Sequence, residues 1–115
     1  MPTYLLPDEA PTRDNVDSLE GPVLIEFGTG WCGHCRALAP VVDKLLADFP
    51  GVRHVKVEDG SGRPLGRSFF VKLWPTLVFM HDGKVLQQSA RPDRPTVLAG
   101  LEAIANAGDQ EPFSP

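Results

Sequence analysis

The two cysteines of this sequence, Cys32 and Cys35, are separated by only two residues, and this spacing constrains the chain more than any other feature. The pair follows a nearly continuous apolar run at residues 23–27 and precedes residues 33–49, where apolar side chains recur at helical spacing. Two thiols at the start of a helix lie on one turn with their Cα atoms about 5–6 Å apart, within the range that a disulfide requires. Because such a bridge closes a very short loop, it adds little stability. The spacing therefore favours a reversible dithiol–disulfide pair rather than a permanent structural disulfide.

The composition is that of a soluble globular protein with one domain. The chain has 115 residues, of which 42% are hydrophobic and 23% charged. Its formal net charge of −4 argues against a nucleic-acid-binding protein, which usually carries a basic patch. No run approaches the ~18 consecutive apolar residues of a membrane span. The N-terminus lacks the basic cluster of a targeting segment, and two cysteines are too few for a secreted disulfide framework. We therefore expect a monomer that binds neither nucleic acid nor membrane and is cytoplasmic, the alternative being a periplasmic protein whose signal segment has been removed.

Apolar patterning and turn signals predict one α/β domain at residues 22–108. An N-terminal extension at residues 1–21, irregular or with a short helix capped by Thr12, should precede it, and a flexible tail should follow at residues 109–115. Strands are expected at residues 4–6 (an edge strand), 23–27, 52–57, 76–80 and 84–89, and helices at residues 13–19, 33–49, 65–70 and 93–108. A helix joining two strands implies that they are parallel, whereas a tight turn joins antiparallel strands. The order predicts a mixed central sheet with helices on both faces.

Four features in a fixed order identify a family resemblance. They are Trp31 before the first cysteine, Pro40 inside the following helix, Trp74-Pro75-Thr76 before the third core strand, and the Asp82-Gly83 hairpin turn. With the cysteine pair, these features resemble the thioredoxin family over roughly residues 20–107. The resemblance implies a thioredoxin fold. The dipeptide between the cysteines, Gly33-His34, resembles that of protein disulfide isomerase rather than the Gly-Pro of ordinary thioredoxins.

Cys32 is the candidate nucleophile, because a helix N-terminus favours the thiolate that attacks disulfides. Cys35 is the candidate resolving thiol, which would attack the mixed disulfide between Cys32 and a substrate. The alternatives are an inert buried thiol at Cys32 and a permanent structural disulfide between the two. A protonated His34 would stabilise the thiolate and make the pair more oxidising; otherwise it is a solvated side chain that tolerates the turn.

Glu26 interrupts an otherwise apolar strand, so its carboxylate must be neutral, paired or near water. The family usually has aspartate here, and the resemblance implies that Glu26 moves a proton to or from Cys35. The alternative is an exposed carboxylate at the end of the strand. Lys56 matches a family lysine near that carboxylate, or is an ordinary surface lysine. We expect His54 and His81 to be surface residues.

The resemblance also implies a groove that binds an extended segment of a substrate protein. Pro75 would be a cis-proline facing the cysteines. Trp31 would offer partners a flat apolar surface, although core packing is an alternative. Three positions depart from the family: Trp74 is larger than the usual residue, Arg91 stands where many thioredoxins have glycine, and Gly28 replaces a common tryptophan. The full set of expected substrate-binding residues is Trp31, Gly33, Trp74, Pro75, Thr76 and Arg91.

These observations predict a thiol–disulfide oxidoreductase that exchanges the Cys32–Cys35 pair with protein disulfides through a mixed disulfide. It would need no cofactor besides its own redox-active disulfide, and a reductase such as a thioredoxin reductase would recycle it. The alternative is a non-catalytic module that binds a partner in the groove around Trp31, Trp74 and Pro75. A metal site is not expected, because two thiols and His34 on one turn fit the usual zinc coordination poorly.

Overall fold

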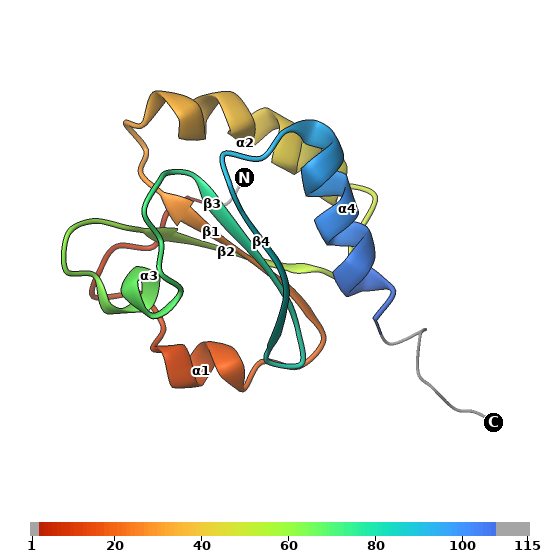
Figure 1. Cartoon of the computed structure of the whole chain (residues 1–115), viewed down its shortest axis with the longest axis horizontal. Helices are drawn as coiled ribbons and strands as arrows, with labels where there is room; N and C mark the ends of the chain where they lie inside the picture. Colours follow the sequence, from red (N-terminus) through yellow and green to blue (C-terminus); the bar gives the residue numbers. More distant parts are fainter. Residues whose placement is uncertain (1–2, 108–115) are drawn as a thin grey trace.

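The computed structural model describes residues 3–107 and contains four helices and four strands within that range (Figure 1). In chain order they are α1 (Arg13–Asp17), β1 (Pro22–Gly28), α2 (Gly33–Leu46), β2 (Arg53–Glu58), α3 (Pro64–Ser68), β3 (Thr76–His81), β4 (Lys84–Ala90) and α4 (Arg94–Ala105). This order confirms the predicted α/β domain. The expected tail at residues 109–115 and the expected helix end at Gly108 lie outside the described residues.

The sheet has the strand order β2-β1-β3-β4, with β1 at its centre. β1 pairs parallel with β2, to which α2 connects it, and antiparallel with β3. The hairpin turn at Asp82 and Gly83 makes β3 and β4 antiparallel, as predicted. Every residue of β1 from Val23 to Gly28 is buried, which explains why the strand is almost continuously apolar. The mixed sheet is therefore the predicted one.

Helices cover both faces of the sheet, and each face has its own apolar core (Figure 1). On one face α2 and α4 pack over the sheet, with Leu38 and Leu101 meeting Leu77 and Phe79. Gly100 brings α4 close, because a Cβ at this position would lie 2.6 Å from the Phe79 ring. On the other face α1 and α3 contribute Val16 and Leu65. The site described below lies at one end of this two-sided core.

The N-terminal extension is tied to the sheet before α1 begins. Leu5 forms a single parallel bridge with Val57, through backbone hydrogen bonds to Lys56 and Glu58. The edge strand expected at residues 4–6 is therefore reduced to one bridge. Thr12 caps α1 as predicted, by accepting a hydrogen bond from the Asn15 N–H at 3.1 Å. The bridge places the residue before it, Tyr4, under the start of α2.

Within residues 3–107 no helix has both the length and the apolar character that crossing a bilayer requires.

Candidate active site

The strand register gathers the predicted site residues at one edge of the sheet. Phe27 at the end of β1 pairs with Thr76 at the start of β3, and Thr76 pairs with Ala90 at the end of β4. The loop to α2, the loop before β3 and the loop after β4 therefore meet at this edge. These loops carry Cys32, Pro75 and Arg91, which lie 43 and 16 positions apart along the chain.

Cys32 is the N-cap residue of α2, and the first N–H groups of the helix point toward its sulfur. The Cys35 N–H donates a hydrogen bond to Cys32 Sγ at 3.3 Å. Burial by itself would raise the pKa of Cys32, which is 8% exposed. The Cys35 thiol and the N–H groups of Cys35 and His34 outweigh burial, and the nearby charge of Arg91 adds to them, so the pKa lies below its ordinary value. The helix end thus favours the Cys32 thiolate, as predicted from the sequence.

Cys35 lies one turn further along α2 and is only 1% exposed. Burial, with the neighbouring Cys32 sulfur, raises the pKa of the Cys35 thiol to about 11. Both thiols are free in this structure. The two sulfurs therefore differ: the Cys32 thiol loses its proton more easily than an ordinary cysteine, and the Cys35 thiol stays protonated until a base takes its proton.

We expect an alkylating agent such as iodoacetamide to modify Cys32 selectively at neutral pH and to spare Cys35. The Cys32 rate should fall with falling pH only once the pH drops below its lowered pKa, so the midpoint should lie below the ~8.5 of a free cysteine. Peptide mass spectrometry over a pH series measures both rates. A midpoint at the free-cysteine value, or equal labelling of both thiols at neutral pH, would contradict the assignment.

Glu26 is buried in the centre of the sheet, with 1% of its side chain exposed. Its two carboxylate oxygens have different partners: Oε1 lies 2.8 Å from His54 Nε2, and Oε2 accepts a hydrogen bond from the Tyr4 hydroxyl at 3.2 Å. The alternative of an exposed carboxylate at the strand end is therefore wrong. Because both of its oxygens have protein partners on separate segments, the buried carboxylate of Glu26 is fixed by hydrogen bonds rather than solvated.

The expectation that His54 is a surface residue is wrong, since 9% of its side chain is exposed. Parallel pairing places Lys56 opposite Glu26 and His54 opposite Leu24, so all four share one face of the sheet. His54 thereby reaches back to the carboxylate. His54 and Lys56 are two residues apart on one strand, and this spacing could have indicated from the sequence that they share a face. His81 is only partly exposed and lies with its Nδ1 3.3 Å from Asp82 Oδ2.

Lys56 is buried, so it is not the surface lysine of the alternative prediction. Its ammonium lies 4.4 Å from the centre of the Tyr4 ring, a cation–π contact. The strand register places Lys56 opposite Glu26, near the carboxylate as the family resemblance suggested, although among residues 3–107 its ammonium forms no ion pair with that carboxylate. Tyr4 was not predicted as a site residue at all. The space left by Gly28, where the family resemblance implied a tryptophan, was the signal that could have pointed to it.

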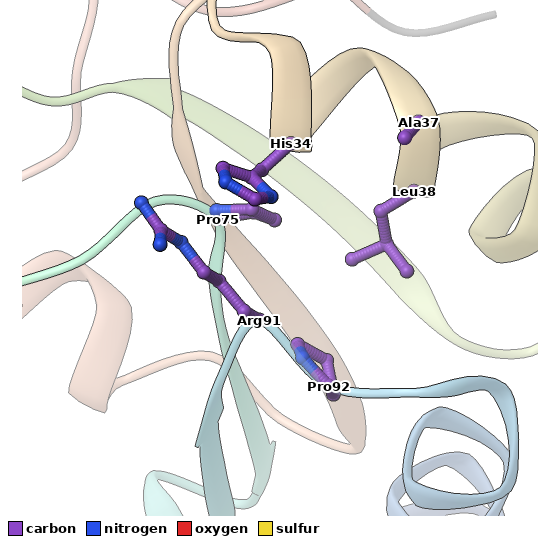
Figure 2. Close-up of a pocket in the computed structure, with 6 residues that line it drawn as sticks. All are labelled: His34, Ala37, Leu38, Pro75, Arg91 and Pro92. Carbon is purple, nitrogen blue, oxygen red and sulfur yellow. The ribbon is translucent and has the colours of Figure 1, made fainter.

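A cavity of about 210 Å³ lies beside the cysteines, between the start of α2 and the loops before β3 and after β4. Figure 2 shows the His34 ring, Pro75 and the Arg91 side chain gathered at one end, with Leu38 and Pro92 toward the other. The Trp74–Pro75 peptide bond is cis, as the resemblance implied. His34 is exposed and forms part of the wall, as does Arg91. Gly33 is exposed at the first turn of α2.

Arg91 has a φ of 49°, in the left-handed region that favours glycine. Two hydrogen bonds hold Arg91: its backbone N–H donates to the Pro75 carbonyl and its Nε to the Trp74 carbonyl, both at 2.8 Å. Arg91 therefore stabilises the proline loop, the segment Trp74–Pro75 before β3, and places a positive charge near Cys32.

The two tryptophans, Trp31 and Trp74, lie edge to face with their ring centres 5.7 Å apart. Trp31 is 74% exposed, so the core-packing alternative is wrong and its ring is free to meet a partner. The Trp74 Nε1–H donates to Asp59 Oδ2 at 2.8 Å, which fixes the larger side chain. Thr76 is buried and its hydroxyl donates to the Leu73 carbonyl at 2.6 Å. Its hydroxyl is therefore bound to the backbone of the loop that precedes β3.

A Thioredoxin family profile matches residues 8–101. The chain belongs to the thioredoxin family. The thioredoxin of Chlamydia muridarum is 41% identical over 81 residues, which cover 68% of this chain and 78% of that protein. The thioredoxin of Chlamydia trachomatis is 43% identical over 70 residues, covering 60% of this chain and 68% of that one. The structure of reduced thioredoxin 2 from Pseudomonas aeruginosa superposes with a TM-score of 0.80 at 48% identity, covering 93% of this chain and 98% of that chain.

Membership in the thioredoxin family makes this protein a thiol–disulfide oxidoreductase with the motif Cys32-Gly33-His34-Cys35 as its redox-active centre. Thioredoxins work through this dithiol without a cofactor. Within the part of the chain that the structure describes, no three His, Cys, Asp or Glu side chains are grouped to hold a metal ion. The fold is the thioredoxin fold, as the sequence pattern predicted.

Proposed function

We propose that the protein exchanges its dithiol with protein disulfides through a mixed disulfide at Cys32. The Cys32 thiolate attacks a substrate sulfur, forms a new S–S bond and releases the other substrate sulfur as a thiolate. Cys35 then loses its proton and attacks Cys32 Sγ, which closes the Cys32–Cys35 disulfide and frees the second substrate sulfur. The contrast between the two thiols supports this order, because Cys32 has the lowered pKa and Cys35 the raised one.

The substrate class that we propose is an extended protein segment containing a disulfide. Three features support it: the exposed ring of Trp31, the cavity between His34 and Pro75, and the Arg91 side chain that fastens the proline loop. A thioredoxin reductase is the proposed recycling partner, from the family membership. The binding-module alternative has less support, because a binding groove needs neither a lowered thiol pKa nor a second buried thiol.

Glu26 is the proposed acceptor of the Cys35 proton. It is buried within the same end of the sheet, and its two partners, Tyr4 and His54, keep the carboxylate oriented. A carboxylate can accept a proton from a thiol only if a hydrogen-bonded route joins them.

Replacing Cys35 with serine should trap the mixed disulfide, because Cys32 remains to attack and no second thiol remains to resolve it. The variant, incubated with an oxidised substrate such as insulin, should form a covalent adduct that disappears on adding dithiothreitol. Non-reducing gel electrophoresis and mass spectrometry identify the linked residue. Cys32→Ser is the matched control and should give no adduct. Partner capture that survives loss of both cysteines would instead favour the binding module.

A further inference from the structure

The Tyr4 hydroxyl lies between the resolving thiol and the buried acid. An ideal Cβ placed on Gly28 would be 2.6 Å from Cys35 Sγ and 2.8 Å from the Tyr4 hydroxyl, so both atoms lie against the same point of β1. The same hydroxyl donates to Glu26 Oε2 at 3.2 Å. Tyr4 and Cys35 also line one cavity of about 380 Å³, together with Lys56. One oxygen thus borders both the thiol and the carboxylate.

The surrounding structure holds this arrangement in place. Gly28 carries no side chain, which leaves the space that the tyrosine hydroxyl and Cys35 Sγ share. The backbone of Leu5 forms hydrogen bonds with the backbone of Lys56 and Glu58, and these bonds fix the neighbouring Tyr4 against the sheet. The Lys56 ammonium lies over the Tyr4 ring. His54 occupies the other oxygen of Glu26, so Oε2 is left for Tyr4.

Among residues 3–107 Glu26 accepts hydrogen bonds from Tyr4 and contacts His54, and none joins it directly to Cys35. A hydroxyl can donate one hydrogen bond while accepting another. Tyr4 donates to Glu26, which leaves its oxygen lone pairs on the side of Cys35. We propose that Tyr4 is the proton-transfer residue that joins Cys35 to Glu26 during resolution of the mixed disulfide. This inference rests on the mixed-disulfide mechanism proposed above.

The Cys35 Sγ–H proton moves to the Tyr4 oxygen as the Tyr4 O–H proton moves to Glu26 Oε2. The electron pair left on Cys35 Sγ forms the S–S bond with Cys32 Sγ. The bond between Cys32 and the substrate sulfur breaks, and that sulfur leaves with the electron pair as a thiolate. Tyr4 ends as a neutral phenol, unchanged.

The electrostatic surroundings agree with a neutral relay rather than a tyrosinate base. Burial raises the pKa of Tyr4 far above its ordinary value, and the nearby Glu26 and Cys35 raise it further. The phenol therefore keeps its proton at any physiological pH. Its part is to pass a proton on, which requires both its hydrogen and its oxygen lone pairs.

Tyr4→Phe tests the proposal, because it keeps the ring over Gly28 and beside Lys56 and removes only the hydroxyl. The reduced protein is mixed at neutral pH with excess dithiobis-nitrobenzoate in a stopped-flow instrument. The first release of coloured thiolate reports attack by Cys32, and the second reports resolution by Cys35. We expect an unchanged first phase and a second phase slowed at least about tenfold, since positioned proton transfer contributes roughly 10²–10⁴-fold.

Two further variants separate the outcomes. Leu6→Ala, at a 51% exposed position on the same segment, should leave both phases unchanged. Glu26→Gln should slow the second phase, and Tyr4→Phe should slow it little further in that background, because both variants break one route. A normal second phase in Tyr4→Phe overturns the relay while leaving the mixed-disulfide mechanism intact. Absence of any mixed disulfide in Cys35→Ser overturns both.

Discussion

Replacing Cys32 with serine is expected to abolish disulfide reduction. A serine hydroxyl is not ionised at neutral pH, so the helix N-terminus has no anion to stabilise and no thiolate begins the exchange. We expect the rate of insulin reduction, measured by turbidity with a thiol reductant, to fall by at least about a thousandfold, equivalent to ~4 kcal/mol of transition-state stabilisation. The residual rate should equal that of the reductant alone.

The fold should survive this change, because the Cys32 side chain only caps α2 and serine is a good N-cap residue. Circular dichroism and the thermal midpoint of Cys32→Ser should therefore match those of the wild type. Leu6→Ala serves again as a neutral control for the assay. Substantial activity remaining in Cys32→Ser would mean that Cys35 can attack substrates unaided, which its burial and raised pKa argue against.

Replacing His34 with proline is expected to lower the redox potential of the Cys32–Cys35 pair. The His34 backbone N–H helps to lower the pKa of Cys32, and proline has no N–H. Losing a hydrogen bond to a charged group costs about 1.5–3 kcal/mol. A reduced form destabilised by that amount shifts the potential by about 30–60 mV to more negative values. This is within the gap of about 90 mV between thioredoxin and protein disulfide isomerase.

The control is His34→Ala, which removes the imidazole and keeps the N–H. His34 lies in the first turn of α2, where proline is tolerated, so both variants should fold. Equilibration in glutathione buffers, followed by tryptophan fluorescence or thiol labelling, gives the potentials. We expect His34→Ala to shift the potential in the same direction by less than His34→Pro. An unchanged potential in His34→Pro would remove the role assigned to residue 34.

Local patterns in the sequence were enough to predict the scaffold. The apolar run of β1 identified a central strand, because a strand covered on both faces has no solvent side to keep polar. The Asp82-Gly83 turn predicted the β3–β4 hairpin, and Asp93 predicted the start of α4, where its side chain accepts from the Thr96 N–H at 3.0 Å. The cysteine spacing predicted the redox centre. Each of these signals is carried by residues close together in the chain.

The surroundings of Glu26 could not be predicted in the same way. The sequence indicated that a buried carboxylate needs partners, but not which ones. Tyr4 and His54 lie 22 and 28 positions away along the chain, and only the strand register and the Leu5–Val57 bridge bring them to the acid. Likewise the exposure of Trp31 and the inward turn of the Thr76 hydroxyl depend on what packs beside them.

The sequence by itself therefore determined the elements, their order and the two sulfurs that react. The tertiary structure decided which polar groups stand beside those sulfurs. The physical reason is one of range: apolar periodicity, caps and turns act within a few residues, whereas a hydrogen bond within the folded core joins whichever side chains the packing brings within about 3 Å. In this protein that packing brings the Tyr4 hydroxyl and the buried Cys35 thiol against the same point of β1.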